Sequence, residues 1–310
     1  MLPEHAEAAL PGLLAALERG GYEFVAPTPA THARIVARPD KAEARDLRGI
    51  FGWSLPFAPG LLSDDLRAEL RYAGLLESHD GLLKSRVRVS RLGGRLFVHS
   101  AFPTDDPDSV FLGPDSYRFV DFLRAELPRT AGVRRLVDIG AGAGVGAIAS
   151  AGMLPGARLT LVDVNRAALR LAGINARHAG IDVELVEGEG IDAVAGLVDL
   201  VIANPPYVMD EQDRAYRDGG AMHGAQISLD WTLAAARRLE PSGRMLLYTG
   251  VAIVDGKDAF RERLEAELPA LDCALRYREL DPDIFGEELE KPPYADVERI
   301  AAIGAVIEKA

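Results

Sequence analysis

Residues 136–144 read Leu-Val-Asp-Ile-Gly-Ala-Gly-Ala-Gly, a strand-like run that ends in three alternating glycines. Glycines after a parallel strand let the backbone turn sharply and let a ligand approach without side-chain obstruction. A second strand-like run, 159–162, leads to Asp163, nineteen residues beyond Gly144. A carboxylate at that place can accept hydrogen bonds from the ribose hydroxyls of a nucleoside cofactor. The two features together predict an adenosine-type cofactor without naming it.

The sequence around the glycine loop alternates short β-rich runs with helix-like stretches, which is typical of a parallel α/β sheet. Asn165 is expected to begin the helix after the second strand, and Gly180 to end it. Further elements are expected at 183–186 (strand), 200–203 (strand), 226–239 (helix), 245–248 (strand), 273–280 (strand) and 298–308 (strand). The last two strands are predicted to form a hairpin that adds one antiparallel strand to the sheet.

The first hundred residues have a different pattern, which predicts a smaller α+β domain at 1–104, followed by a second domain at 105–310. Helices are expected at 3–19, at 40–47 and after the N-cap Ser63. The alternating run 86–98, with Gly93-Gly94 at its centre, predicts a hairpin. Residues 105–108 (Asp-Asp-Pro-Asp) form a plausible linker.

Composition narrows the class of protein. The chain has 310 residues with 48% hydrophobic residues, so it can bury a large core and is not a disordered protein. The single cysteine, Cys273, excludes an intramolecular disulfide and a cysteine metal cluster, and no metal site is expected. We see neither a signal peptide nor a membrane-spanning run and expect a cytoplasmic protein. The net charge of −12 weighs against a large nucleic-acid footprint.

The motif Asn204-Pro205-Pro206-Tyr207 follows the fourth strand. With the glycine loop and Asp163, it makes residues 110–310 resemble the class I S-adenosylmethionine (SAM)-dependent methyltransferases. Within them, the chain resembles the amino-methyltransferases that act on planar nitrogen: the adenine exocyclic-amine enzymes and the release-factor glutamine methyltransferases. The resemblance implies a Rossmann-like, seven-stranded, mostly parallel sheet with helices on both faces.

The chemistry of a planar amino group explains the motif. The nitrogen of an amide or of adenine is a poor nucleophile because its lone pair is delocalised. The Asn204 side-chain oxygen and the Pro205 carbonyl can each accept a hydrogen bond from that NH₂ group, which holds the nitrogen and stabilises its developing charge. The Tyr207 ring can pack on the planar group and exclude water. We therefore predict Asn204, Pro205 and Tyr207 as the catalytic residues.

The resemblance also implies a set of cofactor-binding residues. Glu189, after the third strand, can accept a hydrogen bond from the adenine amino group. Tyr117 belongs to the segment 111–117, which occupies the place of the family's segment that closes over SAM, although the family's Arg-Pro-Glu-Thr-Glu-like sequence is absent. The predicted SAM-binding residues are Asp138, Gly140, Gly142, Gly144, Asp163, Glu189, Asn204 and Tyr117. Residues 218–220 and His223 resemble a stretch that can cover the site, whereas 291–294 (Lys-Pro-Pro-Tyr) is expected to be a loop.

Three methyl acceptors remain open at this point. The first is a protein glutamine, in a release factor or ribosomal protein; the second is an adenine amine of rRNA, tRNA or DNA; the third is a small molecule. The acidic balance favours the first, while a basic hairpin, with Arg86 and Arg88 expected on one face, keeps the second in play. The oligomeric state is left open, and no membrane partner is expected.

Two functions from other protein classes explain the sequence less well. A nicotinamide-dependent oxidoreductase fits the loose pattern of Gly142, Gly144 and Ala147, but it leaves the Asn-Pro-Pro-Tyr motif unexplained. A SAM-binding interaction module without activity would not need the Asn204 side chain. Binding of SAM rather than NAD would separate the first rival, and turnover would separate the second.

Overall fold

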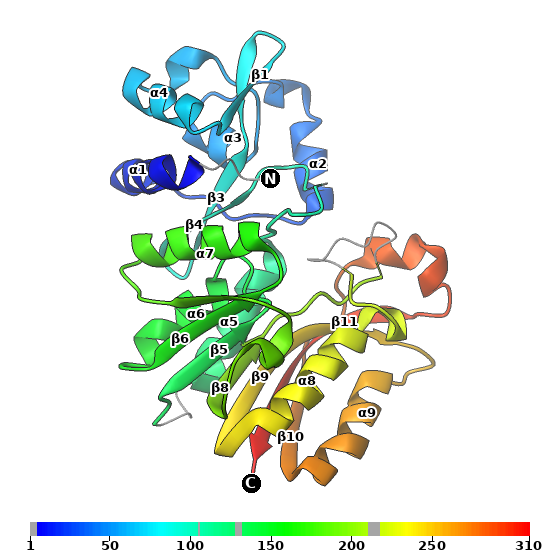
Figure 1. Ribbon diagram of the computed structural model, residues 1–310. Coiled ribbons are helices and arrows are strands. Elements are labelled where there is room, and N and C mark those ends of the chain that lie inside the picture. The colour runs from blue at the N-terminus through cyan, green and yellow to red at the C-terminus, as the bar shows by residue number, and fades with distance from the viewer. Residues whose placement is uncertain (1–4, 105, 128–131, 210–217) are drawn as a thin grey trace.

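The computed structural model describes residues 5–104, 106–127, 132–209 and 218–310. Its centre is a seven-stranded sheet in the order β10-β11-β9-β8-β5-β6-β7 (Figure 1). The strands are β5 (Arg135–Ile139), β6 (Arg158–Asp163), β7 (Glu184–Glu187), β8 (Val198–Ala203), β9 (Leu239–Ile253), β10 (Cys273–Asp281) and β11 (Arg299–Lys309). Strand β11 is antiparallel to both of its neighbours, β9 and β10, and thus runs opposite to the other six strands of this sheet. The predicted class I fold with one antiparallel strand is therefore confirmed.

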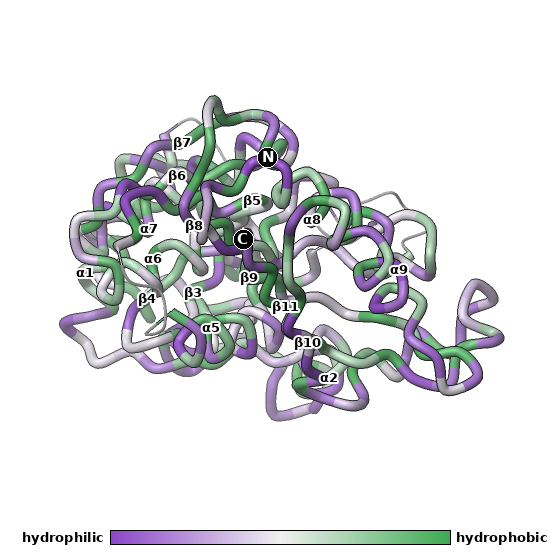
Figure 2. Tube along the Cα trace, turned by 90° about the horizontal axis from the view of Figure 1, so that it is seen from below, coloured by the Kyte–Doolittle hydropathy of each residue, from purple (hydrophilic) through white to green (hydrophobic). Residues whose placement is uncertain are grey.

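Helices cover both faces of the sheet because its strands are apolar on both sides. Along β8, Leu200 and Ile202 pack on one side, and Val201 and Ala203 on the other. The first face is covered by α5 (Pro114–Glu126), α6 (Val145–Ser150) and α7 (Arg166–His178), and the second by α8 (Gln226–Arg238) and α9 (Ala259–Glu267). Hydrophobic colour gathers around β9 in the middle of the molecule (Figure 2). No helix among the described residues is long and apolar enough to cross a bilayer.

The N-terminal elements lie at one end of the sheet, beside α7 (Figure 1). They are α1 (Ala6–Arg19), α2 (Pro29–Val36), α3 (Leu47–Phe51), α4 (Asp64–Tyr72), and the hairpins β1–β2 (Leu76–His79, Leu82–Ser85) and β3–β4 (Val87–Leu92, Arg95–Ser100). Short 3₁₀ turns complete the chain at Pro39–Lys41, Pro59–Leu61, Ala151–Met153, Gly190–Ala193, Met222–Gly224, Leu268–Leu271, Gly286–Glu290 and Pro292–Tyr294. The predicted N-cap is confirmed, since the Ser63 Oγ accepts a hydrogen bond from the Leu66 amide.

Two N-terminal predictions were wrong. Residues 40–47 do not form a helix: a 3₁₀ turn ends at Lys41, and α3 begins only at Leu47, where the Asp46 carboxylate caps it by accepting from the Gly49 amide. The basic face of the hairpin does not exist either. Arg86 lies at a bend and is exposed, whereas Arg88 is only 2% exposed and packs inside the N-terminal core.

The N-terminal elements are joined to the sheet by a continuous hydrophobic core. That core runs from α1 and the β3–β4 hairpin into α6 and α7. At its centre the buried Asn175 side chain of α7 accepts a hydrogen bond from the Val98 amide (2.8 Å) and donates to the Val98 carbonyl (3.1 Å) and the Ala143 carbonyl (2.9 Å). One side chain thus holds the last strand of the hairpin against the glycine loop.

Candidate active site

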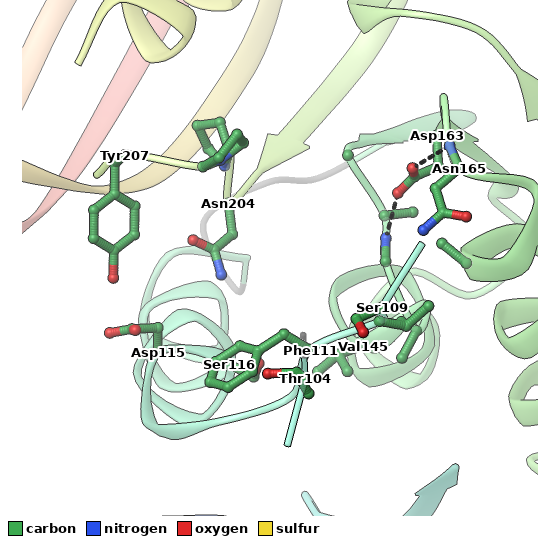
Figure 3. A pocket seen from close by; sticks show the side chains of 18 of the residues that line it. Thr104, Ser109, Phe111, Asp115, Ser116, Val145, Asp163, Asn165, Asn204 and Tyr207 are labelled. Atoms are coloured by element: carbon green, nitrogen blue, oxygen red, sulfur yellow. Dashed lines mark hydrogen bonds between the residues drawn. The ribbon is translucent and has the colours of Figure 1, made fainter. Parts of the chain in front are cut away.

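A cavity of about 700 Å³ opens at the carboxyl ends of the parallel strands. The loops after β5, β6 and β8 all reach this edge, which is where ligands bind in open α/β sheets. The glycine loop and Asp163 lie toward one end of the cavity, and Asn204 and Tyr207 toward the other (Figure 3). The N-terminal helix α2 supplies part of the wall, through Pro29, Ala30 and Ala33.

The glycine loop has the tight backbone that its sequence predicts. Gly140 and Gly142 have positive φ angles of 68° and 53°, a conformation that favours glycine. A Cβ on Gly140 would lie 2.8 Å from the indole ring of Trp231, so a larger residue does not fit there. Both glycines line the cavity. The loop therefore presents bare backbone to a ligand.

Asp163 is tied to the same loop. Its two carboxylate oxygens accept hydrogen bonds of 2.8 Å from the amides of Gly142 and Asn165 (Figure 3). Burial raises the pKa of Asp163, and these amide bonds oppose the rise. Each oxygen keeps a further lone pair for a ligand hydroxyl. Asn165 also caps α7 as predicted, with its side chain accepting from the Ala167 amide.

Asp138, near the end of β5, connects the glycine loop to helix α6. The side chain is 2% exposed and accepts a hydrogen bond of 2.9 Å from the Ala147 amide in the first turn of α6. Burial raises the pKa of this carboxyl to about 7, and the charge of nearby Asp163 adds to the rise. Asp138 lines the cavity wall. Its contact fixes where α6 begins relative to β5.

Asn204 stands at the opposite end of the cavity from Asp163. Its side-chain Oδ1 is buried and has no hydrogen-bond partner among the described residues. A buried amide oxygen without a partner costs free energy, so its presence in a cavity indicates a ligand donor. Pro205 and Pro206 also line the cavity. The motif therefore brings an unpartnered hydrogen-bond acceptor, the Asn204 oxygen, to the cavity.

The Tyr207 ring is fixed by its surroundings. It packs against Gly250 of β9, where a Cβ would lie 2.3 Å from the ring, and Phe285 meets it edge-on with centroids 5.8 Å apart. The hydroxyl points toward the Asp115 carboxylate (Figure 3). Burial first, and then the charge of Asp115, raise the pKa of Tyr207 well above its usual value.

The second Pro-Pro-Tyr, at 292–294, supports the first. We expected a loop there, and the segment forms a 3₁₀ turn in which Tyr294 is 1% exposed. The Tyr294 hydroxyl accepts a hydrogen bond of 2.7 Å from the Met209 amide, two residues beyond the Asn-Pro-Pro-Tyr motif. The chain between β10 and β11 thus braces the loop after β8.

Sequence reasoning missed Asp115. This residue lies in the first turn of α5, lines the cavity and is 6% exposed. Its Oδ1 accepts hydrogen bonds from the Tyr248 hydroxyl (2.7 Å) and from the Arg118 guanidinium (3.3 Å). The available signal was its place beside Pro114 in the segment that we expected to close over SAM, from which we selected Tyr117 instead.

Not every predicted residue lies at the cavity. Glu189 is part of the wall, but Tyr117 and Gly144 are not among the lining residues. Tyr117 is on the other side of α5, where its hydroxyl accepts a hydrogen bond from the Ala26 amide. Gly144 begins α6 with φ +79°, and its Cα faces the packed side chains of α7 and β6. His223 is also absent from the wall and contacts Asp296 at 3.1 Å.

The segment 218–220 packs beside the motif. Asp218 lines the cavity, and the Gly219 amide donates to the Val208 carbonyl at 2.8 Å. A Cβ on Gly219 would lie 1.8 Å from the Gly224 carbonyl oxygen, so the close packing there requires glycine. The stretch before it, residues 210–217, lies outside the described residues. The prediction that this segment covers the site therefore stays a prediction.

Residues 119–251, which carry most of these loops, match the methyltransferase small domain family. The matched region is a methyltransferase domain, and the sheet that carries it has the class I strand order. The match favours methyl transfer over the oxidoreductase alternative, which leaves the Asn-Pro-Pro-Tyr motif without a role.

The chain is similar to several known methyltransferases. The release factor glutamine methyltransferase of Deinococcus radiodurans is 28% identical over 66% of this chain and 73% of its own length. The ribosomal protein uL3 glutamine methyltransferase of Neisseria gonorrhoeae is 30% identical, and the match spans about half of each protein, 45% of this chain and 48% of that one. A solved 16S rRNA N2 G1207 methyltransferase of Thermus thermophilus, in complex with AdoMet and guanosine, has a TM-score of 0.47 at 18% identity and covers 83% of this chain and 64% of its own.

The methyl donor of the methyltransferase is SAM, and the cavity fits that molecule. Bare glycine backbone and the Asp163 carboxylate meet at one end, where a nucleoside with free ribose hydroxyls can bind. The unpartnered Asn204 oxygen lies at the other end, away from the loop. With a volume of about 700 Å³, the cavity has room for a donor and an acceptor together.

Proposed function

We propose that this methyltransferase transfers a methyl group from SAM to the side-chain amide nitrogen of a glutamine in a protein of the translation machinery, a release factor or a ribosomal protein. The names of the similar proteins support this substrate class, since both curated relatives above are glutamine methyltransferases. The proposal places the enzyme in the cytoplasm, where translation takes place.

One observation carries the proposal: the buried Asn204 Oδ1 has no partner within the described part of the chain. A primary amide has two N–H groups, and the Asn204 oxygen and the Pro205 carbonyl can accept one each. This pairing holds the amide nitrogen with its lone pair directed at the donor, and it favours the positive charge that develops during transfer. A group without an N–H donor would leave the Asn204 oxygen unpaired.

The other residues of the cavity would bind either the methyl donor or the methyl acceptor. SAM, when bound, supplies an electrophilic methyl group on a sulfonium. Asp163 and Glu189 would hold its adenosine part above the loop of Gly140 and Gly142, and Asp138 positions that loop. The Tyr207 ring, held by Gly250 and Phe285, would cover the planar amide and keep water from it. We no longer assign a cofactor contact to Tyr117 or Gly144, because neither lines the cavity.

We also propose that residues 1–104 form a domain that selects the protein substrate. Helix α2 of this region contributes to the cavity wall, so a partner bound to the N-terminal elements would lie beside the active site. Arg91, another basic residue of the same hairpin, is paired with Glu18 and Glu23. The burial of Arg88 and the pairing of Arg91 weaken the case for an RNA-tracking hairpin.

A labelling experiment tests the substrate. A lysate of cells that lack this protein is supplied with SAM carrying a radiolabelled methyl group and with purified enzyme, then separated into protein, RNA, DNA and small molecules. Label is expected in protein, on glutamine, with wild type and with Arg177→Ala, a control at an exposed position of α7. Asn204→Ala should give no label while binding SAM nearly as well as wild type. Label in RNA, DNA or small molecules would contradict the glutamine assignment.

A further inference from the structure

The buried carboxylate of Asp115 lies at the acceptor end of the cavity and is not used by the function proposed so far. The side chain is 6% exposed and lines the cavity, where it faces the Tyr207 hydroxyl (Figure 3). A carboxylate is expensive to bury, and one that borders an active-site cavity is a candidate for a role in the reaction. The Asn204 amide projects into the same space from the other side.

Three elements hold this carboxylate in place. The Tyr248 hydroxyl of β9 donates to Oδ1 at 2.7 Å, and Arg118, one turn along α5, donates to the same atom at 3.3 Å. Arg118 is in turn paired with Asp281, at the end of β10, at 2.8 Å. Tyr207 approaches from the loop after β8. These contacts fix the side chain without neutralising its charge, because Arg118 is shared with a second carboxylate.

Resting on the proposed function, we infer that Asp115 is a catalytic residue that stabilises the positive charge on the acceptor nitrogen and then takes its proton. The nitrogen lone pair forms a bond to the methyl carbon while the carbon–sulfur bond of the donor breaks, leaving its electron pair on sulfur. The nitrogen then carries a positive charge, and one of its N–H protons passes to the Asp115 carboxylate. No further reactant is needed, and the neutral methyl amide remains. After the product is released, Asp115 gives the proton to water.

The reaction requires a group that accepts the proton of the methylated nitrogen. An N-methylated, N-protonated amide is strongly acidic, so nothing has to remove the proton before transfer. In a cavity closed by Tyr207, Phe285 and a bound partner, however, water is excluded, and the proton needs an acceptor within the protein. The nearby negative charge also lowers the barrier as positive charge grows on nitrogen.

The acid side of the pH profile should report this carboxylate. Burial is the main cause that raises the pKa of Asp115, while the hydrogen bond from Tyr248, the nearby Tyr207 hydroxyl and the charge of Arg118 oppose the rise. The reactive form is the carboxylate. Turnover should therefore fall as the pH is lowered through a pKa higher than the ordinary aspartate value of 3.8.

The test is Asp115→Asn, which keeps the side-chain shape and an acceptor for the Tyr248 hydroxyl but removes the charge. On the acceptor that the labelling experiment identifies, we expect kcat to fall by roughly 100-fold, with the KM of SAM and the melting temperature nearly unchanged and with the acid limb lost. Tyr248→Phe is the matched variant. It removes one bond to Asp115 and leaves the carboxylate, so the acid limb should persist and kcat should fall less.

Two outcomes would overturn the inference. One is a kcat of Asp115→Asn within threefold of wild type with the same acid limb. The other is a loss of SAM affinity that accounts for the lost activity, which would make Asp115 part of the donor site. Neither depends on the chemical identity of the acceptor. If wild type labels RNA instead of protein, the glutamine assignment fails, and the same comparison on that RNA still decides the role of Asp115.

Discussion

Replacing Asn175 by alanine should weaken the junction between the N-terminal elements and the sheet. The side chain is 1% exposed and makes three hydrogen bonds, to the amide and carbonyl of Val98 and to the carbonyl of Ala143. At about 1 kcal/mol net for each bond, the free energy of unfolding should fall by about 3 kcal/mol. This figure is a lower limit, because the three backbone groups stay buried and lose their partners. At roughly 2 °C per kcal/mol for a chain of this size, the melting temperature should fall by about 6 °C.

The assay compares thermal unfolding of wild type, Asn175→Ala and Arg177→Ala. Arg177 lies on the same helix but is exposed, so its replacement should change the free energy of unfolding by no more than about 0.5 kcal/mol. Hydrogen exchange gives a local readout, because the Val98 amide loses its acceptor only in Asn175→Ala. If Asn175→Ala melts within about 1 °C of Arg177→Ala and the exchange of β4 is unchanged, the junction does not depend on this side chain.

Three further predictions concern the cavity and the N-terminal core. Asp163→Ala should weaken SAM binding by about 10- to 100-fold in calorimetry, because hydrogen bonds to a charged acceptor are lost; a dissociation constant within threefold of wild type would argue against this carboxylate as a donor contact. Gly250→Ala would place a methyl group 2.3 Å from the Tyr207 ring and should lower kcat by about 10- to 100-fold while SAM binding is retained, and full activity would show that the ring need not be held there. The contribution of His32 to the free energy of unfolding should decrease as the pH falls from about 6.5 to about 4, because burial and the neighbouring Arg88 lower its pKa to about 4; the buried Asp138 carboxyl, whose pKa is raised to about 7, contributes with the opposite sign in this range. An NMR titration of the His32 ring would check the last prediction, and a ring that titrates near pH 6.5 would contradict it.

Local signals were sufficient for the framework of the site. The glycines of 140–144, Asp163 and the motif at 204–207 each follow a strand, and the carboxyl ends of parallel strands meet at one edge of a sheet. Their place in the cavity thus follows from strand order. The fold, the methyl donor and the chemistry of Asn204 could all be argued from the residues themselves and from the resemblance they carry.

Predictions failed where a side chain's direction depends on what packs against it. Period-two alternation placed Arg86 and Arg88 on one face, but the chain bends at Arg86, and α2 covers Arg88, whose guanidinium contacts the His32 ring at 3.0 Å. On α5, both Asp115 and Tyr117 were available to face the cavity. The rotation of the helix, set by its contacts with β9 and α6, turned Asp115 inward.

By itself, the sequence determined a parallel α/β sheet, a glycine loop with its acidic partner, and an Asn-Pro-Pro-Tyr turn suited to a planar nitrogen. All of these depend on residues close together in the chain. Only the tertiary structure decided that Asp115 meets Tyr248, 133 positions away, that Tyr294 braces the loop after β8, and that Asn175 joins the two parts of the molecule. The physical reason is that such contacts form when distant elements pack. Their energies depend on burial and hydrogen-bond geometry, which no local pattern encodes.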